Sequence, residues 1–236
     1  MIKDIEFKAQ SSEWLDFRKK YITGTEIASL FGLNPYKSAN DLALEKTAGV
    51  EFPFTDNSFV KIGRVYEDAI INQVGGIAAG DKGNVKLYYD EEVGISCTLD
   101  GIYQDVPLEC KCMYYNSFVN KHKGTMPPHY MLQLITQMHM LGKDVGYFGV
   151  LLYCPENFAK ADGFDPHFSM YPLIIESITL YRLEVKDIHI LMETVKEAVE
   201  DLYDRKSAYR SKVKRNKIVK EFLKDNVTFE KVEQYE

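Results

Sequence analysis

The stretch GISCTLDGIYQDVPLECKCM, residues 94–113, contributes most to the prediction of the fold. Its two ends, 94–99 and 108–113, are rich in β-branched, leucine and cysteine residues, a composition typical of strands. Between them, Asp100-Gly101 marks a turn. The stretch therefore predicts two consecutive strands joined by a short connection.

The second of these strands carries two charged residues on one face. Alternate residues of a strand point to the same side of a sheet, so Glu109 and Lys111 project together, while Cys110 and Cys112 face the other way. Asp100 ends the preceding strand. If the two strands pair, the carboxylates of Asp100 and Glu109 meet at one edge of the sheet.

Two carboxylates at one edge can hold divalent cations through oxygen, as Mg²⁺ requires. A neighbouring ammonium, here that of Lys111, can orient an attacking water and offset negative charge on a phosphodiester. The alternative is an exposed hairpin with a Glu–Lys pair, because Asp-Gly is common at turns and Glu-x-Lys occurs by chance in many proteins.

The rest of the chain alternates between helical and strand-like patterns. Further strand-like runs cover 85–89, 145–153 and 174–185. Helical patterns cover the segments from Ser11 or Ser12, from about Thr25 to Phe31, Ser38–Thr47, Phe59–Val74, Pro127–Leu141 and about Lys186–Lys224. This order predicts an α/β fold with a central mixed β-sheet flanked by helices.

The composition is that of a globular protein with a sizeable core, since 45% of the residues are hydrophobic and 27% are charged. No apolar run approaches the length needed to cross a bilayer, so we expect no membrane association. Residues 1–6 contain no apolar signal core, which predicts a cytoplasmic protein. There the four cysteines, Cys97, Cys110, Cys112 and Cys154, would stay reduced.

The charge of the chain is unevenly distributed. The net charge of −6 argues weakly against a nucleic acid partner, although a metal-dependent nuclease must concentrate carboxylates somewhere. The segment RKSAYRSKVKRNKIVK, residues 205–220, holds eight basic residues and no acidic one. This segment either follows a DNA backbone or forms a solvated helix face.

Four further motifs surround the two strands. They are Trp14-Leu15-Asp16-Phe17-Arg18, Ile22-Thr23-Gly24-Thr25-Glu26-Ile27-Ala28, Gly63-Arg64-Val65-Tyr66-Glu67 and Tyr130-Met131-Leu132-Gln133. In this order and at these spacings, residues 12–153 resemble the phage lambda-type exonuclease family, also called the YqaJ-like viral recombinases, within the PD-(D/E)XK nuclease group. The combination is far more specific than any single motif.

The resemblance implies a restriction-endonuclease-like core within a single nuclease domain, residues 1–236. The catalytic core would cover about 60–185, preceded by N-terminal helices at 11–47 and followed by a C-terminal helical extension at about 186–236.

It also implies roles for individual residues of the catalytic centre. Asp100 and Glu109 match the metal-binding carboxylates, the backbone carbonyl of Cys110 would be a third metal ligand, and Lys111 matches the lysine that positions the water. Leu99 stands where the group's name has Pro, a departure that removes no ligand.

Two further matches lie on the flanking helices. Glu67 matches a helical glutamate that reaches the metal site, and Gln133 matches a glutamine that orders it. Without the resemblance, Glu67 would read as a solvated carboxylate, and Gln133 would read as one polar residue beside an apolar helix stripe.

Three residues match the site that binds the 5′-phosphate of a DNA end. Arg18 resembles the arginine that receives the phosphate, since a guanidinium can bind phosphate bidentately. Thr25 and Thr98 stand where family members carry hydroxyls. The alternative for Arg18 is a surface ion pair with Asp16 or Glu13 on its own helix.

The resemblance implies 5′-to-3′ digestion of one strand of double-stranded DNA. The cofactor would be two Mg²⁺ ions, or Mn²⁺ in their place. The 3′ single-stranded tail would pass to a single-strand annealing protein during phage-type recombination, and the chain would form a homotrimeric ring around the DNA. A DNA endonuclease of the same fold and a non-catalytic DNA-binding scaffold are the competing hypotheses.

Overall fold

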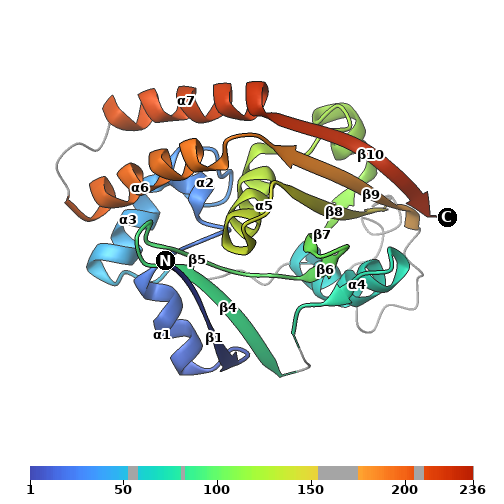
Figure 1. Ribbon diagram of the computed structural model, residues 1–236, viewed down its shortest axis with the longest axis horizontal. Coiled ribbons are helices and arrows are strands. Elements are labelled where there is room, and N and C mark those ends of the chain that lie inside the picture. Colours follow the sequence, from blue (N-terminus) through green and yellow to red (C-terminus); the bar gives the residue numbers. More distant parts are fainter. Residues whose placement is uncertain (53–57, 81–82, 154–174, 205–209, 236) are drawn as a thin grey trace.

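The computed structural model describes residues 1–52, 58–80, 83–153, 175–204 and 210–235 (Figure 1). The strands form two mixed sheets, and the helices pack against them. In spatial order, the larger sheet contains β10 (Val227–Tyr235), β9 (Ile175–Val185), β8 (Val145–Tyr153), β7 (Val106–Tyr114), β6 (Gly101–Tyr103) and β3 (Ile77–Ala78). The smaller sheet contains β1 (Ile2–Lys8), β4 (Asn84–Asp90), β5 (Ile95–Thr98) and β2 (Ile22–Thr23).

The helices follow the predicted segments closely. They are α1 (Ser12–Lys20), α2 (Ile27–Leu30), α3 (Ala39–Ala48), α4 (Ser58–Gln73), a π-helical turn η1 (Ser117–Lys121), α5 (Pro128–Leu141), α6 (Ile188–Asp204) and α7 (Arg210–Asn226). Ser11 caps α1, Ser38 forms a capping box on α3, and Gly142 ends α5 in the left-handed conformation that glycine adopts without strain. No helix in these described ranges is long and apolar enough to span a membrane.

Strand β8 is the centre of the larger sheet, and its two faces are covered by different helices. It pairs in parallel with β7 and antiparallel with β9. Helix α4 approaches one face so closely that a Cβ on Gly149 would lie 2.5 Å from Ile70. On the other face, a Cβ on Gly146 would lie 2.9 Å from Leu134 of α5. The strand predicted at 145–153 is confirmed, and its continuous apolar run is buried between two helices.

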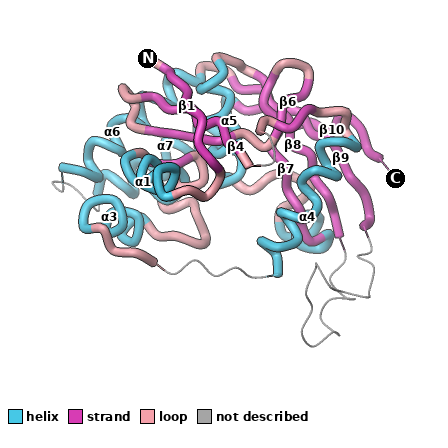
Figure 2. Tube along the Cα trace, turned by 90° about the horizontal axis from the view of Figure 1, so that it is seen from below, coloured by secondary structure: helices cyan, strands magenta, loops and turns pink. Residues whose placement is uncertain are grey.

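Helix α5 is the element that joins the two sheets. It contacts β7 and β8 of the larger sheet and β4 and β5 of the smaller one, and it lies between them in Figure 1. Figure 2 shows the same arrangement from below, with α4 beside the larger sheet and α1 beside the smaller one. Residues of α5 can therefore reach functional groups on both sheets.

The predicted α/β class, with a mixed sheet flanked by helices, is confirmed, but the strands are divided between two sheets. The strand that ends near Asp100 does not pair with the strand that carries Glu109, so the condition under which we expected their carboxylates to meet is not fulfilled. Strand β5 pairs with β4 and β2, whereas the partner of β7 on this side is the short β6. Pairing between strands depends on contacts between distant segments, which periodicity alone does not specify.

Two segments differ from the predicted secondary structure. The C-terminal extension is helical only as far as Asn226, and Val227–Tyr235 then forms β10 against β9. The N-terminal Ile2–Lys8 is a strand paired with β4, although only two of its seven residues are partly buried. Such a mostly exposed edge strand lacks the alternation that identifies a half-buried strand.

Candidate active site

A tight hairpin positions the first carboxylate. Strands β6 and β7 are joined by Gln104 and Asp105, whose φ angles of 49° and 67° form the left-handed turn that two-residue hairpins favour. The hairpin pairs Gly101 with Leu108. Asp100 then lies beside β7, where its Oδ2 accepts a hydrogen bond of 2.9 Å from the backbone N–H of Cys110.

The second carboxylate lies on the face of β7 that α5 covers. Glu109 is 0% exposed, and its Oε1 accepts hydrogen bonds from Lys111 and, at 2.6 Å, from Gln133. The prediction that Glu109 and Lys111 share one face is confirmed. Cys110 packs on the opposite face with Ile70 of α4, as the alternation of the strand requires.

Glu67 of α4 lies close enough to Glu109 and Lys111 to interact with their charges. Its side chain is partly buried, and burial followed by the charge of Glu109 raises its pKa above the usual range. The structure therefore brings Asp100, Glu109, Lys111, Glu67 and Gln133 together from three separate elements, β7, α4 and α5, and from the residue before β6.

The charges of this group do not balance. Burial, and then the neighbouring carboxylate of Glu109, raise the pKa of Asp100 well above its usual range. Burial lowers the pKa of Lys111, but the carboxylates of Glu109 and Asp100 outweigh it and raise that pKa overall. Three carboxylates thus share one ammonium, and their mutual repulsion would be relieved by an added cation.

The donor atoms fit a hard divalent cation. Carboxylate oxygens of Asp100 and Glu109 and the carbonyl of Cys110 are the oxygen ligands that Mg²⁺ and Mn²⁺ accept. Within the described ranges, no three His, Cys, Asp or Glu side chains converge into a complete metal site. A cation at this position would therefore depend on backbone oxygen, water or substrate for its remaining ligands.

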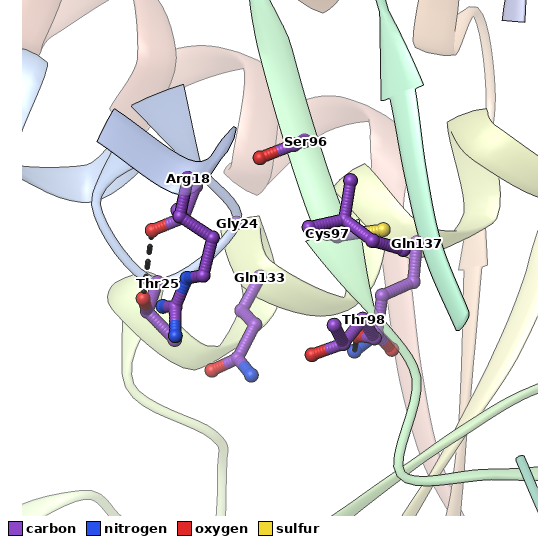
Figure 3. A pocket seen from close by; sticks show the side chains of 10 residues that line it. Arg18, Gly24, Thr25, Ser96, Cys97, Thr98, Gln133 and Gln137 are labelled. Atoms are coloured by element: carbon purple, nitrogen blue, oxygen red, sulfur yellow. Dashed lines mark hydrogen bonds between the residues drawn. The ribbon is translucent and has the colours of Figure 1, made fainter. Parts of the chain in front are cut away.

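The three predicted phosphate-binding residues line one pocket. Arg18, Thr25 and Thr98 line this pocket, and Gln133 lies between Thr25 and Thr98 in the view of Figure 3. The guanidinium of Arg18 lies 4.4 Å from the centroid of the Trp14 ring.

Arg18 remains without an ion-pair partner among the described residues. It does not pair with Asp16, which instead lies 3.8 Å from Lys19. Burial lowers the pKa of Arg18, and the more distant carboxylates of Glu26 and Glu45 partly oppose that effect. The pocket therefore presents a positive charge that an anion would neutralise.

Gln137 connects this pocket to the carboxylates, and the sequence analysis missed it. Its Nε2 donates to Oε2 of Glu109 and, at 3.1 Å, to the carbonyl of Thr98, a contact drawn in Figure 3. It is 0% exposed and lines the pocket. The available signal was its position four residues after Gln133, which places both amides on the same face of α5.

Two other contributors were also missed. Ser96 lines the pocket with a fully buried hydroxyl that has no hydrogen-bond partner among the described residues. The Nζ of Lys111 lies 4.8 Å from the centroid of the Tyr130 ring, a cation–π contact that fixes the lysine. Serine and tyrosine are common residues, so the sequence alone does not show that Ser96 and Tyr130 lie beside the pocket and Lys111.

The basic segment 205–220 is only partly covered, because 205–209 and the side chains of 210–213 lie outside what the structure describes. In the remainder, Arg215 lies 2.5 Å from Asp201 of α6, and Lys217 lies 3.7 Å from Glu221. Lys214 and Lys220 are exposed. Both readings of this segment, DNA contact and solvated face, therefore stay open as predictions.

Comparison with solved structures shows a shared fold. An alkaline exonuclease from Laribacter hongkongensis, LHK-Exo in complex with dAMP, matches with a TM-score of 0.54 and 19% identity over 89% of this chain and 99% of that one. A phage-related exonuclease from Haemophilus somnus matches with a TM-score of 0.54 and 14% identity over 78% of this chain and 94% of that one. These neighbours bear out the restriction-endonuclease-like fold.

Two sequence relatives also match. An uncharacterized protein of Acanthamoeba polyphaga mimivirus is 30% identical over 166 residues, which cover 61% of this chain and 29% of that protein. The Bacillus subtilis protein YqaJ, also uncharacterized, is 27% identical over 147 residues, which cover 59% of this chain and 46% of that protein. The matched regions thus span less than half of either relative.

The sequence model of one protein family matches residues 13–144, more than half of the chain. That interval includes the pocket with Arg18, the carboxylates, Lys111 and both glutamines of α5. The chain belongs to the family of YqaJ-like viral recombinase domains.

Proposed function

We propose that this chain is a metal-dependent exonuclease that degrades one strand of duplex DNA from its 5′ end. One observation carries the proposal: the pocket around Arg18 directly adjoins the buried carboxylate group, and Gln133 and Gln137 belong to both. Among the described residues, Arg18 has no ion-pair partner. A pocket for a terminal phosphate beside a hydrolytic centre is the arrangement that an exonuclease acting on DNA ends needs.

The pocket would select a phosphorylated 5′ end. The guanidinium of Arg18 can donate two parallel hydrogen bonds to a phosphate, and the hydroxyls of Thr25 and Thr98 can each donate one more. With the terminal phosphate held there, the next phosphodiester of the same strand is the one nearest to the carboxylates. The expected product is a 5′-mononucleotide.

The carboxylate group would carry out the hydrolysis. Asp100, Glu109 and the Cys110 carbonyl would hold Mg²⁺ or Mn²⁺, two ions in the full site, with Glu67 contributing from α4. When bound, the metal supplies Lewis acidity that activates water and stabilises charge on the phosphodiester oxygens.

The neighbouring side chains would prepare the site. Lys111 would donate a hydrogen bond to the attacking water and offset developing negative charge. Gln133 and Gln137 would hold the carboxylate of Glu109 in one orientation through their amide N–H groups.

The proposed biological setting is the one that the resemblance implies. The 3′ single-stranded tail would be passed to a single-strand annealing protein in the cytoplasm during phage-type recombination. A homotrimeric ring around the DNA would keep the enzyme on its substrate between cycles. An endonuclease with the same residues in the same roles is the second candidate, with Arg18 then contacting an internal phosphate.

A time course with Mg²⁺ separates these candidates. The substrates are a linear duplex labelled at the 5′ or the 3′ end and a closed circle of the same sequence. The exonuclease releases the 5′ label first, as mononucleotide, and leaves the circle intact. Cutting of the circle would indicate the endonuclease, and binding without cutting would indicate a DNA-binding scaffold.

A further inference from the structure

A partly buried group of four charged residues lies beside the pocket, and we call it the Glu26 cluster. It consists of Glu26, Lys37, Glu45 and Lys46. Lys46 Nζ lies 2.9 Å from Oε2 of Glu26, and Lys37 Nζ lies 3.1 Å from Oε1 of Glu26 and 2.7 Å from Glu45. The Lys46 side chain is only 3% exposed. Such burial is rare for lysine and requires a complete set of partners.

Lys46 has that complete set. Besides Glu26, its ammonium donates to the backbone carbonyls of Arg18, at 3.1 Å, and Tyr21, at 2.8 Å. Glu26 in turn accepts the backbone N–H of Thr23 at 3.0 Å. The cluster thus ties the C-terminal end of α1, which carries Arg18, to the turn that carries Thr25.

The charges of the cluster cancel. Burial raises the pKa of Glu26, but Lys46 and the N–H of Thr23 outweigh it, so this pKa lies below its usual value and the carboxylate is charged. Two carboxylates then balance two ammoniums. The guanidinium of Arg18, which has no ion-pair partner among the described residues, is the charge left over.

We propose that Lys46 and Lys37 keep the carboxylate of Glu26 occupied, so that Arg18 stays available for the 5′-phosphate. They are positioning residues that set the preference for phosphorylated ends, and they do not touch the DNA themselves. This inference rests on the phosphate-binding part of the proposed function and is independent of cleavage.

Removal of Lys46 has a definite electrostatic consequence. Glu26 would then hold a surplus negative charge in buried surroundings, and the guanidinium of Arg18, which already feels the charge of Glu26, could neutralise it. An Arg18 captured in this way would bind phosphate weakly. Removal of Glu26 together with Lys46 would release Arg18 again.

The test is a binding measurement without metal. The fluorescence of Trp14, the single tryptophan of the chain, reports on the pocket because Arg18 stacks on its ring. Short duplexes with a 5′-phosphate or a 5′-hydroxyl are titrated in EDTA, and the ratio of their affinities is recorded. We expect Lys46→Met to lower this ratio about tenfold, and Lys46→Met with Glu26→Gln to restore most of it.

Lys37→Met is the second variant, because it leaves the backbone contacts of Lys46 in place and should fold if Lys46→Met does not. It should lower the ratio about threefold, less than Lys46→Met does, since Glu26 then keeps Lys46, the more buried of its two partners. Lys3→Met removes a lysine from an exposed ion pair with Glu91 and should leave the ratio unchanged.

The outcomes are distinguishable. Equal ratios in Lys46→Met and the double variant would overturn the inference, since the cluster would then be a scaffold only. Unchanged ratios in both lysine variants would overturn it as well. A wild-type protein that prefers the 5′-phosphate but does not cut DNA would contradict the nuclease proposal and leave this inference standing. No preference in the wild type would contradict the phosphate pocket and the inference together.

Discussion

Two groups of charged residues border the same pocket, and they are built in opposite ways. The Glu26 cluster matches two carboxylates with two lysines, and the pKa of Glu26 is lowered. The group around Glu109 matches three carboxylates with Lys111 alone, and the pKa of Asp100 is raised. The first group is complete and stabilises the fold. The second has more carboxyl groups than cations, and burial and mutual repulsion raise the pKa values of Asp100 and Glu67, as expected of a site that acquires a cation.

The largest effect is predicted for substitutions in the group around Glu109. Asp100→Asn or Lys111→Ala should lower the rate of DNA cleavage at least about a thousandfold, because each removes a group that acts on the phosphodiester or holds the metal. Asp100→Asn should leave the thermal midpoint unchanged or higher, since it removes a repelled buried carboxylate. Initial rates and thermal unfolding test both expectations.

The matched control for this change is Asp105→Asn, at an exposed aspartate in the β6–β7 turn. Asp105→Asn should cleave DNA at the wild-type rate. Mg²⁺ at about ten times its dissociation constant should stabilise the wild type by about 1.4 kcal/mol, and Asp100→Asn should lose this stabilisation. Normal turnover of Asp100→Asn would contradict the assignment.

The second prediction concerns a substitution in the Glu26 cluster. Glu26→Gln leaves the buried Lys46 without its carboxylate, and loss of one partner of a buried ion pair costs about 3 kcal/mol of unfolding free energy. Urea unfolding at pH 7 measures this cost. The exposed Glu51→Gln serves as control and should cost little, because its carboxylate is largely solvated.

The same variant has a predicted pH dependence. The folded-state pKa of Glu26 lies below its unfolded value, so its contribution is fully present above the unfolded pKa and is lost as the pH falls through the folded pKa. The difference in unfolding free energy between wild type and Glu26→Gln should therefore shrink in acid. A difference that stays constant down to about pH 3 would contradict the charged state of Glu26.

The smallest predicted effect concerns the link between the two regions. Gln137→Met removes both hydrogen bonds that hold Glu109 and the Thr98 carbonyl together, and should lower the cleavage rate about tenfold. Thr136→Val, on the same buried turn of α5, loses only a hydrogen bond within the helix and should cut at the wild-type rate. Equal rates for the two variants would mean that Gln137 has no positioning role.

The sequence allowed prediction of local features wherever a local rule governs them. The two-residue spacing of Glu109 and Lys111 predicted their shared face, and the serines at 11 or 12 and at 38 predicted where two helices begin. The convergence of Arg18, Thr25 and Thr98 came from the family resemblance, because no periodicity relates residues so far apart.

What the sequence did not predict depends on contacts between distant segments. The split into two sheets follows from the pairing of β5 with β2 and β4, and the position of Asp100 follows from β6. Gln137 reads as one more residue of a buried helix until Glu109 and the Thr98 carbonyl are seen beside it. The Glu26 cluster joins residues up to 20 positions apart through side-chain contacts that leave no sequence pattern.

The most direct measurement compares single-turnover cleavage of a 5′-phosphorylated and a 5′-hydroxyl duplex by the wild type and by Arg18→Ala. The adjacency of an end pocket and a hydrolytic centre predicts that the wild type cuts the phosphorylated end faster, and that Arg18→Ala loses this preference while still cutting the hydroxyl end at a comparable rate. An Arg18→Ala protein that keeps the full preference for the 5′-phosphate would contradict the account.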